Sequence, residues 1–404
     1  MTISTAAGPP VTGSDDNGTA PTSPDVLWYI NPTDGEAPWE PTQRYEPTFE
    51  RLRHQARTLD RLGYWGALTT AREPISLVAD TENLRFLIPV YPGVKPPVLM
   101  AEEAQVFDQY SGGRLLINQV NGADPVLHRY GRFHSKAERY RLSAEYWRQV
   151  KRLYLDDAEA YDGEFFTYGP QYKPSIPGPR QPNGLPIWGT GASPEGIDHA
   201  VDVLDVYLSF MSEPSSLAGL FNRVRAAAAA KGRTLRFGVL ASVIVRDTDE
   251  AAWERFEWQL AQTRPETVLA TADRNLRSFG YPGLDEITSD DPQVQARIDA
   301  LRAGRIPARA ELQFAPNMAA GLTTWTAAEP PFDIAGKGTG TYFVGSAENV
   351  AATMRSVAEQ AGIDVWILSA WPLAREAEIA AELLLPQLRE QHSTSGAGHR
   401  ETRR

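Results

Sequence analysis

Strand-length apolar runs alternate with segments of helical periodicity along most of this chain. The first run, Val26–Ile30, is continuous and ends in the turn sequence Asn-Pro-Thr-Asp-Gly. Amphipathic spacing over Pro47–Leu62 then predicts a helix, which Gly63 ends because glycine readily adopts the left-handed conformation. Continuous apolar runs are typical of parallel strands that are buried on both faces. In total we predict strands at residues 26–30, 64–68, 84–90, 115–120, 185–188, 203–210, 235–246 and 365–369.

Helical spacing follows most of these strands. We predict helices at residues 47–62, 98–110, 142–154, 215–231, 250–262, 348–361 and 374–388, with a further helix that begins at Pro194. For the helix at 348–361, Ser346 is the expected N-cap and Gly362 the expected stop.

This alternation favours a single (β/α)8 TIM barrel, an α/β fold, because no domain-like linker divides the chain. The alternative is a doubly wound open sheet, which normally carries G-x-G-x-x-G after its first strand, where this chain has NPTDG. We expect a disordered leader at 1–24, one barrel at 25–390 and a flexible tail at 391–404.

Residues 264–340 interrupt the alternation. They are rich in charge, proline and glycine, with one helical piece near residues 292–303. A long irregular insertion in a compact domain is usually a lid or a binding loop, so we hypothesise that part of this insertion becomes ordered when a ligand binds. Residues 161–183, rich in tyrosine, proline and glycine, predict a second surface excursion.

Composition narrows the possible chemistry. The chain has no cysteine, which removes disulfides, thiolate metal sites and thiol nucleophiles together. Its formal charge of −11 comes without a long basic run, which argues against nucleic acid or an anionic membrane as the main partner. Since no apolar run is long enough to cross a membrane and no signal peptide begins the chain, we expect a cytoplasmic protein.

Polar side chains gather after the strand at 115–120. Asn118 and Asn121 lie at its end, and Asp124, His128 and His134 follow in the loop. The carboxyl ends of parallel strands are where α/β folds bind ligands, so these groups are candidates for a site. The alternative is that Asn121 only begins a turn and that Asn118 is a satisfied core amide.

A loop of small residues, Gly189–Ser193, lies between a predicted strand and a predicted helix. Small residues let backbone N–H groups approach an anion at a helix N-terminus, where the helix dipole adds a favourable field. This pattern indicates a phosphate site, although many such loops are glycine-rich for steric reasons alone.

Other catalytic motifs are absent from the sequence. There is no G-x-S-x-G nucleophile elbow, no P-loop and no H-E-x-x-H, and no histidine has a partner at metal-ligand spacing. His128 and His134 are better explained as phosphate or surface contacts than as ligands. We therefore expect no metal, and we expect an organic cofactor to supply the chemistry.

The ordered segments resemble the bacterial luciferase-like flavin monooxygenases, and within them the alkanesulfonate monooxygenases that depend on reduced FMN. The resemblance covers the chain from Val26 to Leu388. It rests on the stretches LDRLGYWGAL, FDQYSGGRLLINQVNGADP, HSKAERYRLSAEYW, KGRTLRFGVLASVIVRDTDEAAW, LQFAPNMAAG, YFVGSAENVAATM and AGIDVWILSAWPL.

The resemblance implies that FMN lies at the mouth of the barrel. Asn118 would contact the flavin ring system, Tyr140 would reach the phosphate, and Gly191, Ala192 and Ser193 would form the phosphate loop. The family's two phosphate-binding serines correspond here to Gly191-Ala192, so backbone amides and Ser193 would carry more of the contact.

On the substrate side, Arg309 matches an arginine on the family's mobile insertion. The sulfonate enzymes' strand-seven arginine and histidine correspond to Leu240 and Ser242, and their tyrosine after strand eight to Trp371. The resemblance thus assigns Arg309, Ser242 and Trp371 to the substrate site. Their cysteine after strand two has no counterpart here.

These replacements predict a substrate that is bulkier or less charged than simple alkanesulfonates, because a desolvated sulfonate needs fixed cations. Alternatively, Arg72 or Arg129 restores the anion site. The expected activity is oxidation of a small organic molecule with O₂ and reduced FMN, which a separate NAD(P)H:flavin reductase supplies to a homodimer or homotetramer. A deazaflavin (F420)-dependent oxidoreductase of the same barrel superfamily and a non-catalytic flavin-binding protein are the alternatives.

Overall fold

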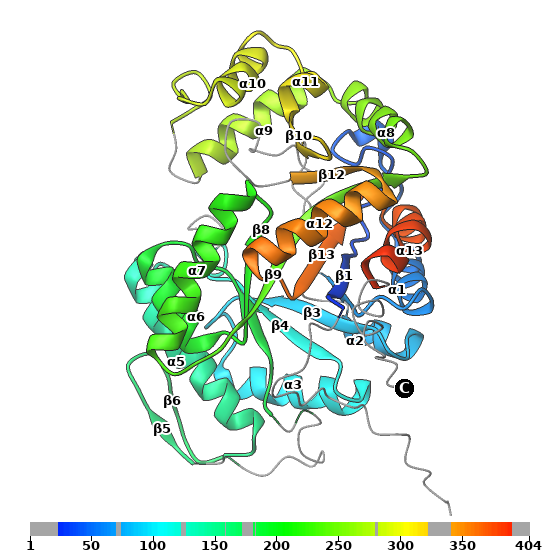
Figure 1. Cartoon of the computed structure of the whole chain (residues 1–404). Coiled ribbons are helices and arrows are strands. Elements are labelled where there is room, and N and C mark those ends of the chain that lie inside the picture. The colour runs from blue at the N-terminus through cyan, green and yellow to red at the C-terminus, as the bar shows by residue number, and fades with distance from the viewer. Residues whose placement is uncertain are drawn as a thin grey trace, which may run out of the picture.

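A closed ring of eight parallel strands forms the centre of the computed structural model, which describes residues 23–69, 74–122, 127–157, 159–171, 181, 183–278, 282–321 and 341–389 (Figure 1). Each strand hydrogen-bonds to the next, and the last strand returns to the first. In ring order they are β1 (Asp25–Tyr29), β2 (Gly66–Leu68), β3 (Arg85–Val90), β4 (Leu115–Gln119), β7 (Ile187–Gly189), β8 (Val206–Phe210), β9 (Arg236–Arg246) and β13 (Val365–Ser369). The predicted (β/α)8 barrel is confirmed.

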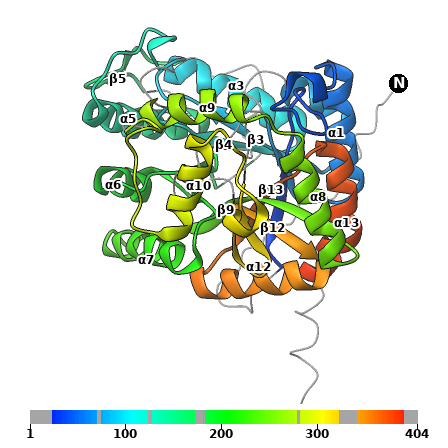
Figure 2. The ribbon, with the colours of Figure 1, turned by 90° about the horizontal axis from the view of Figure 1, so that it is seen from above.

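Helices cover the outside of this ring (Figures 1 and 2). They are α1 (Phe49–Arg61), α2 (Pro74–Leu77), α3 (Pro97–Ser111), α5 (Lys136–Tyr154), α6 (Pro194–Val203), α7 (Pro214–Ala230), α12 (Ala347–Ala361) and α13 (Leu373–Arg389), with short 3₁₀ turns η1 (Pro41–Gln43) and η2 (Val78–Asp80). As expected, Ser346 caps α12 by accepting from Asn349 N, and Gly362 ends it in the left-handed conformation with φ of 68°.

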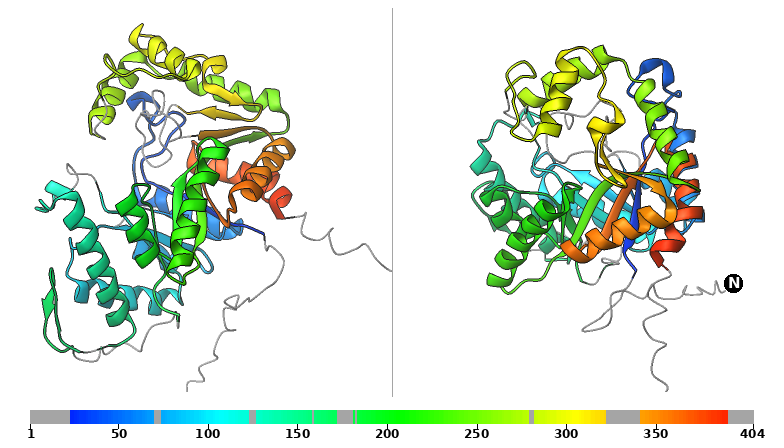
Figure 3. Two further views of the ribbon diagram at one scale, coloured as in Figure 1. Left: turned by 60° about the vertical axis from the view of Figure 1, so that its left-hand side comes forward. Right: turned by 45° about the horizontal axis from the view of Figure 1, so that its top comes forward.

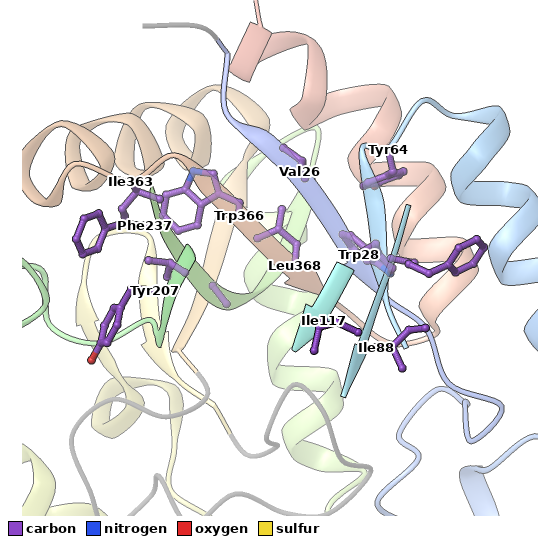
Figure 4. Packing of buried hydrophobic residues seen from close by; sticks show 14 of the residues in the cluster. Val26, Trp28, Tyr64, Ile88, Ile117, Tyr207, Phe237, Ile363, Trp366 and Leu368 are labelled. Carbon is purple, nitrogen blue, oxygen red and sulfur yellow. The ribbon is translucent and has the colours of Figure 1, made fainter. Parts of the chain in front are cut away.

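Side-chain alternation along the strands separates two apolar layers. Residues such as Trp28, Ile117 and Trp366 point outward and pack beneath the helices (Figure 4). Their neighbours in sequence, among them Leu27, Leu116 and Ile367, fill the interior of the barrel. The continuous apolar runs in the sequence therefore arise because both faces of the ring strands are largely buried.

A parallel strand that we did not predict, β12 (Thr341–Ser346), joins the sheet beside β9. β9 has eleven residues, and its Gly238–Ser242 part pairs with β13 while its Ser242–Arg246 part pairs with β12. The prediction of one long strand at 235–246 was correct. The eight predicted strands form the ring, and β12 is additional because a strand of that length extends past the barrel and takes a further partner.

The insertion is more regular than we predicted. Its elements are α9 (Pro265–Ser278), α10 (Pro292–Arg302), α11 (Arg309–Leu312), β10 (Gln313–Ala315) and β11 (Met318–Ala320), and the predicted helix α8 (Asp249–Ala261) precedes it. They share a second core in which Trp253, Phe256 and Ile298 pack with Tyr342 and Val344 of β12. Pro265 and Pro292 each begin a helix, where the missing N–H costs nothing, so proline does not mark irregular structure here.

The insertion lies over the carboxyl-terminal end of the barrel, with α9 and α10 across it (Figures 2 and 3). The excursion predicted at 161–183 contains the hairpin of β5 (Tyr161–Asp162) and β6 (Thr167–Tyr168). Asp124, Arg72, residues 322–340 and nearly all of the predicted leader and tail lie outside the described residues. None of the described helices is long and apolar enough to span a membrane.

Candidate functional site

The inward-facing side chains at the carboxyl ends of the strands form the floor of the candidate site. Strand alternation turns Asn118 of β4 inward, because its neighbours Ile117 and Gln119 lie on the outer face against other residues. Asn118 pairs in register with Pro89 on one side and Trp188 on the other. It is half-buried, and its contact with a flavin ring stays a prediction.

The loop between β7 and α6 brings two glycine backbones into close contact. A Cβ built on Gly191 would lie 2.7 Å from Gly196 O, and one on Gly196 would lie 3.0 Å from the Tyr140 hydroxyl. Ser193 caps α6, since its Oγ accepts from Gly196 N at 3.2 Å. We call Tyr140, Gly191, Ala192, Ser193 and Gly196 the cradle. The structure thus brings together all four residues that the sequence assigned to a phosphate.

A buried hydrogen-bonded chain supports the cradle from behind. Ser143 Oγ of α5 donates to Gln119 Oε1 at 3.2 Å, and His199 Nε2 of α6 lies 2.9 Å from the same Ser143 Oγ. Because the serine proton is directed to Gln119, the histidine proton must be on Nε2. His199 Nδ1 has no partner among the described residues. Burial accordingly lowers the pKa of His199 to about 4, so the ring is neutral at pH 7.

The side of the mouth formed by β9 and β13 is apolar. Leu240 and Ser242 both face inward, and Ser242 Oγ lies 3.3 Å from Ser369 Oγ on the neighbouring strand. Trp371 follows β13 and packs edge-on against Tyr29, with ring centroids 6.4 Å apart. Leu240, Ser242, Ser369 and Trp371 are all buried, and we call them the substrate side. Two of the predicted substrate-site residues, Ser242 and Trp371, therefore share one wall.

One further residue at a strand end, Thr69, was missed by the sequence analysis as a ligand contact. Thr69 directly follows β2, and its buried Oγ1 has no hydrogen-bond partner among the described residues. The same holds for Asn121 Nδ2 after β4 and for Trp371 Nε1 after β13. Buried polar atoms without partners are costly, so a ligand that pairs with them is the simplest explanation. A threonine that ends a buried strand was the available signal for Thr69.

Helix α8 fixes the backbone of Trp371. Arg255 and Gln259 of α8 donate to Trp371 O at 2.8 and 3.3 Å. Arg255 also forms a salt bridge of 2.9 Å with Glu36 in the loop after β1. Glu376 in α13 is almost fully buried and accepts a bidentate pair from Arg246 at 2.9 and 2.7 Å. These polar and charged groups connect α8 to the substrate side, and nothing in the sequence pattern indicated them.

A buried aspartate caps the helix that follows Trp371. Asp34 Oδ1 accepts from Leu373 N at 2.9 Å and from Gly35 N at 2.8 Å, and Oδ2 accepts from Gln55 Nε2 at 3.1 Å. Burial raises the pKa of Asp34 while these donors oppose the shift. The carboxylate lies at the N-terminus of α13, where the helix dipole favours negative charge.

Arg309 lies away from this wall. Its guanidinium stacks on Trp253 at 4.0 Å and lies 3.8 Å from Glu257, both on α8, while its Nε donates to Gln313 Oε1. Among the described residues, none of its recorded contacts is to Asn118, Ser242 or Trp371. The assignment of Arg309 to the substrate therefore stays a prediction that requires its side chain to leave α8.

The barrel thus carries an enzyme-like candidate site. It consists of the cradle at the carboxyl end of β7, Asn118 of β4 and the apolar substrate side. The family model for luciferase-like monooxygenases matches residues 32–365. The chain belongs to that family.

Solved structures support the same fold. The long-chain alkane monooxygenase LadA has a TM-score of 0.71 at 17% identity, with 92% of each chain covered. Riboflavin lyase RcaE with modified FMN and riboflavin has a TM-score of 0.69 at 17% identity, again with 92% of each chain covered. An F420-dependent secondary alcohol dehydrogenase has a TM-score of 0.61 at 13% identity, covering 91% of this chain and 100% of that one. At such identities the likeness concerns the fold.

The residues present fit a phosphorylated flavin. Gly191 and Gly196 approach so closely that a side chain on either would displace backbone atoms. The loop ends at the N-terminus of α6, where the helix dipole favours an anion such as a phosphate. Thr69 and Asn121 offer unpaired buried polar atoms at strand ends, suited to the polar edge of a flavin ring. In the described ranges no cluster of three or more His, Asp and Glu side chains could hold a metal ion.

Proposed function

We propose that this protein is a two-component monooxygenase that binds reduced FMN from a separate NAD(P)H:flavin reductase and uses O₂ to oxidise a small organic substrate. The observation that carries the proposal is the cradle beside inward-facing Asn118, since together they match a phosphate and a flavin ring. Bound there, reduced FMN would supply the reaction with O₂.

The protein's own residues have separate tasks in this proposal. The backbone of Gly191–Ser193 and the Tyr140 hydroxyl bind the phosphate, and Asn118 orients the ring. Leu240 and Trp371 exclude water from the mouth, while the hydroxyl pair of Ser242 and Ser369 offers a hydrogen bond to substrate.

The substrate class follows from the charges on the substrate side. Each charged hydrogen bond that a sulfonate loses costs about 1.5–3 kcal/mol, so an enzyme for sulfonates needs fixed cations. Leu240 and Ser242 supply none, and Arg309 is held against Glu257 and Trp253. We therefore infer a substrate that is bulkier or less charged than a simple alkanesulfonate.

Anaerobic titration tests the cofactor. Reduced FMN is expected to bind more tightly than oxidised FMN, because a diffusible flavin must be captured after its reduction elsewhere. Oxygen consumption with supplied reduced FMN should then depend on substrate. Tight binding of NADPH with turnover by this protein alone would contradict the two-component scheme.

A substrate panel tests the chemistry. With reduced FMN and O₂, sulfones and neutral ketones are expected to be oxidised faster than short alkanesulfonates, and efficient sulfite release would refute the substrate inference. The second candidate, an F420-dependent oxidoreductase, is favoured by the fold it shares with the secondary alcohol dehydrogenase. Hydride exchange with reduced deazaflavin, without oxygen, would select it instead.

A further inference from the structure

A tight turn follows β4 and leads into α5. Tyr130 N and Arg132 N both donate to Leu127 O, at 2.9 and 3.0 Å, and Gly131 N donates to His128 O at 3.0 Å. Gly131 has φ of 70°, a left-handed conformation that favours glycine. Leu127 is buried and anchors the turn. The residues around it are therefore presented outward in a fixed arrangement.

Aromatic side chains on this turn are exposed. Phe133 is 73% exposed and stacks on His128 with ring centroids 4.8 Å apart. Tyr130 is 42% exposed and lies 5.8 Å from Tyr91, which follows β3. Large exposed aromatics carry a hydrophobic cost, so their concentration in one turn at the carboxyl end of the barrel indicates contact with another molecule.

The turn is also basic within an acidic protein. The whole chain carries a net charge of −11, yet residues 127–141 contain five cations, Arg129, Arg132, Lys136, Arg139 and Arg141, against the single acid Glu138. Arg141 pairs with Glu164 and Lys136 with Glu195. None of the ion pairs within the described residues includes Arg129 or Arg132.

The turn is continuous with the cradle. Ser135 caps α5 directly after the turn, and one helical turn later Tyr140 of the same helix places its hydroxyl beside Gly196. Lys136 Nζ lies 3.6 Å from Glu195 in the first turn of α6. A ligand bound to the turn would therefore lie next to α5, the helix that contributes Tyr140 to the cradle.

We propose that His128, Arg129, Tyr130, Arg132 and Phe133 form a capture surface that binds reduced FMN from solution before it enters the cradle. The aromatic rings of the surface can stack on the flavin, and its guanidinium groups can bind the phosphate. FMN combines these two groups in one molecule. Local positive potential on a protein of opposite net charge raises the association rate of an anion. This inference rests on the proposed function and adds the route by which the cofactor arrives.

Anaerobic stopped-flow mixing with photoreduced FMN tests the capture surface. In the double variant Arg129→Gln/Arg132→Gln the association rate constant should fall by about fivefold or more, and its dependence on ionic strength should flatten. The dissociation rate constant should stay within about twofold, because the seated contacts are unchanged. Phe133→Ser should lower the association rate constant and keep its salt dependence.

The matched control is Arg61→Gln/Arg236→Gln, which removes the same charge from exposed ion pairs with Glu378 and Asp25. It should leave the association rate nearly unchanged. Association of riboflavin, which lacks the phosphate, should respond to Phe133→Ser but not to the arginine variant.

Three outcomes overturn the inference. Unchanged association of free reduced FMN with the double variant refutes it while the proposed function stands. If that variant slows turnover only when a reductase delivers the flavin, the surface docks an acidic protein and not the free cofactor. If the parent protein binds no reduced FMN, the proposed function fails and this inference fails with it.

Discussion

The cradle side and the substrate side lie at the same end of one barrel, but different forces hold them. In the cradle, Gly191 and Gly196 meet through backbone atoms, and the defining residues lie within one short stretch of sequence plus Tyr140. On the substrate side, Trp371 is held by Arg255 and Gln259, more than a hundred residues away. The difference teaches that the loop of the cradle is encoded locally, whereas the substrate side depends on long-range side-chain contacts.

Of the predicted changes, removal of the Arg246 side chain should lower the free energy of unfolding the most. Glu376 is 3% exposed, and without Arg246 the one ion pair it keeps among the described residues is the 3.7 Å contact with Arg255 Nε. Breaking a buried pair from one side costs about 3 kcal/mol or more, so Arg246→Met should strongly lower the urea unfolding midpoint. Arg236→Met, which removes an exposed pair with Asp25, is the control and should cost at most about 1 kcal/mol. Equal losses of unfolding free energy in both variants would show that the buried ion pair contributes no more to stability than the exposed one.

Gly191→Ala should affect the cradle alone. The new Cβ must displace Gly196 O, which is 2.7 Å away, and the loss of two charged hydrogen bonds would weaken FMN binding by about 100-fold. Gly219→Ala in α7, where the nearest atom is 3.9 Å from the new Cβ, should bind FMN normally. Fluorescence titration measures both. Normal FMN binding by Gly191→Ala would show that the cradle does not depend on the close backbone contact at Gly191.

The free energy of unfolding should decrease as the pH is lowered, because His199 binds a proton more readily in the unfolded chain. Its folded pKa of about 4 lies below the ordinary value of 6.5, so the unfolded chain binds the proton first and stability decreases as pH drops from 6.5 towards 4. Between pH 7.5 and 5 this amounts to about 2 kcal/mol. Denaturant unfolding at both pH values measures it. His199→Asn should remove that part of the pH dependence, and an unchanged dependence would place the titration elsewhere.

Trp371→Phe should have the smallest effect, a modest loss of turnover, because it changes only the substrate side. The ring contact with Tyr29 is kept and only the unpaired Nε1–H is lost. One neutral hydrogen bond corresponds to about 3–10-fold in turnover of the best panel substrate, with FMN binding unchanged. Trp258→Phe, an exposed position on α8, should alter neither. A weaker FMN affinity in Trp371→Phe would show that the two sides are coupled.

Much of the fold could be predicted from the sequence because buried parallel strands and amphipathic helices are local patterns. The errors fell where an element depends on a distant partner. β12 exists because the extended end of β9 is available to pair with it, and α9 forms over a second core that only the folded chain assembles. Periodicity in a single segment contains no information about such partners.

By itself, the sequence determined the barrel, the loop Gly189–Ser193 and the inward direction of Asn118, since these follow from strand alternation and from the small size of glycine. Only the tertiary structure decided that Tyr140 meets Gly196, that Trp371 is fixed from α8, and that Arg309 packs on Trp253 instead of facing Ser242. The physical reason is that side-chain contacts between distant segments depend on how helices pack around the barrel, and no short-range pattern specifies that packing.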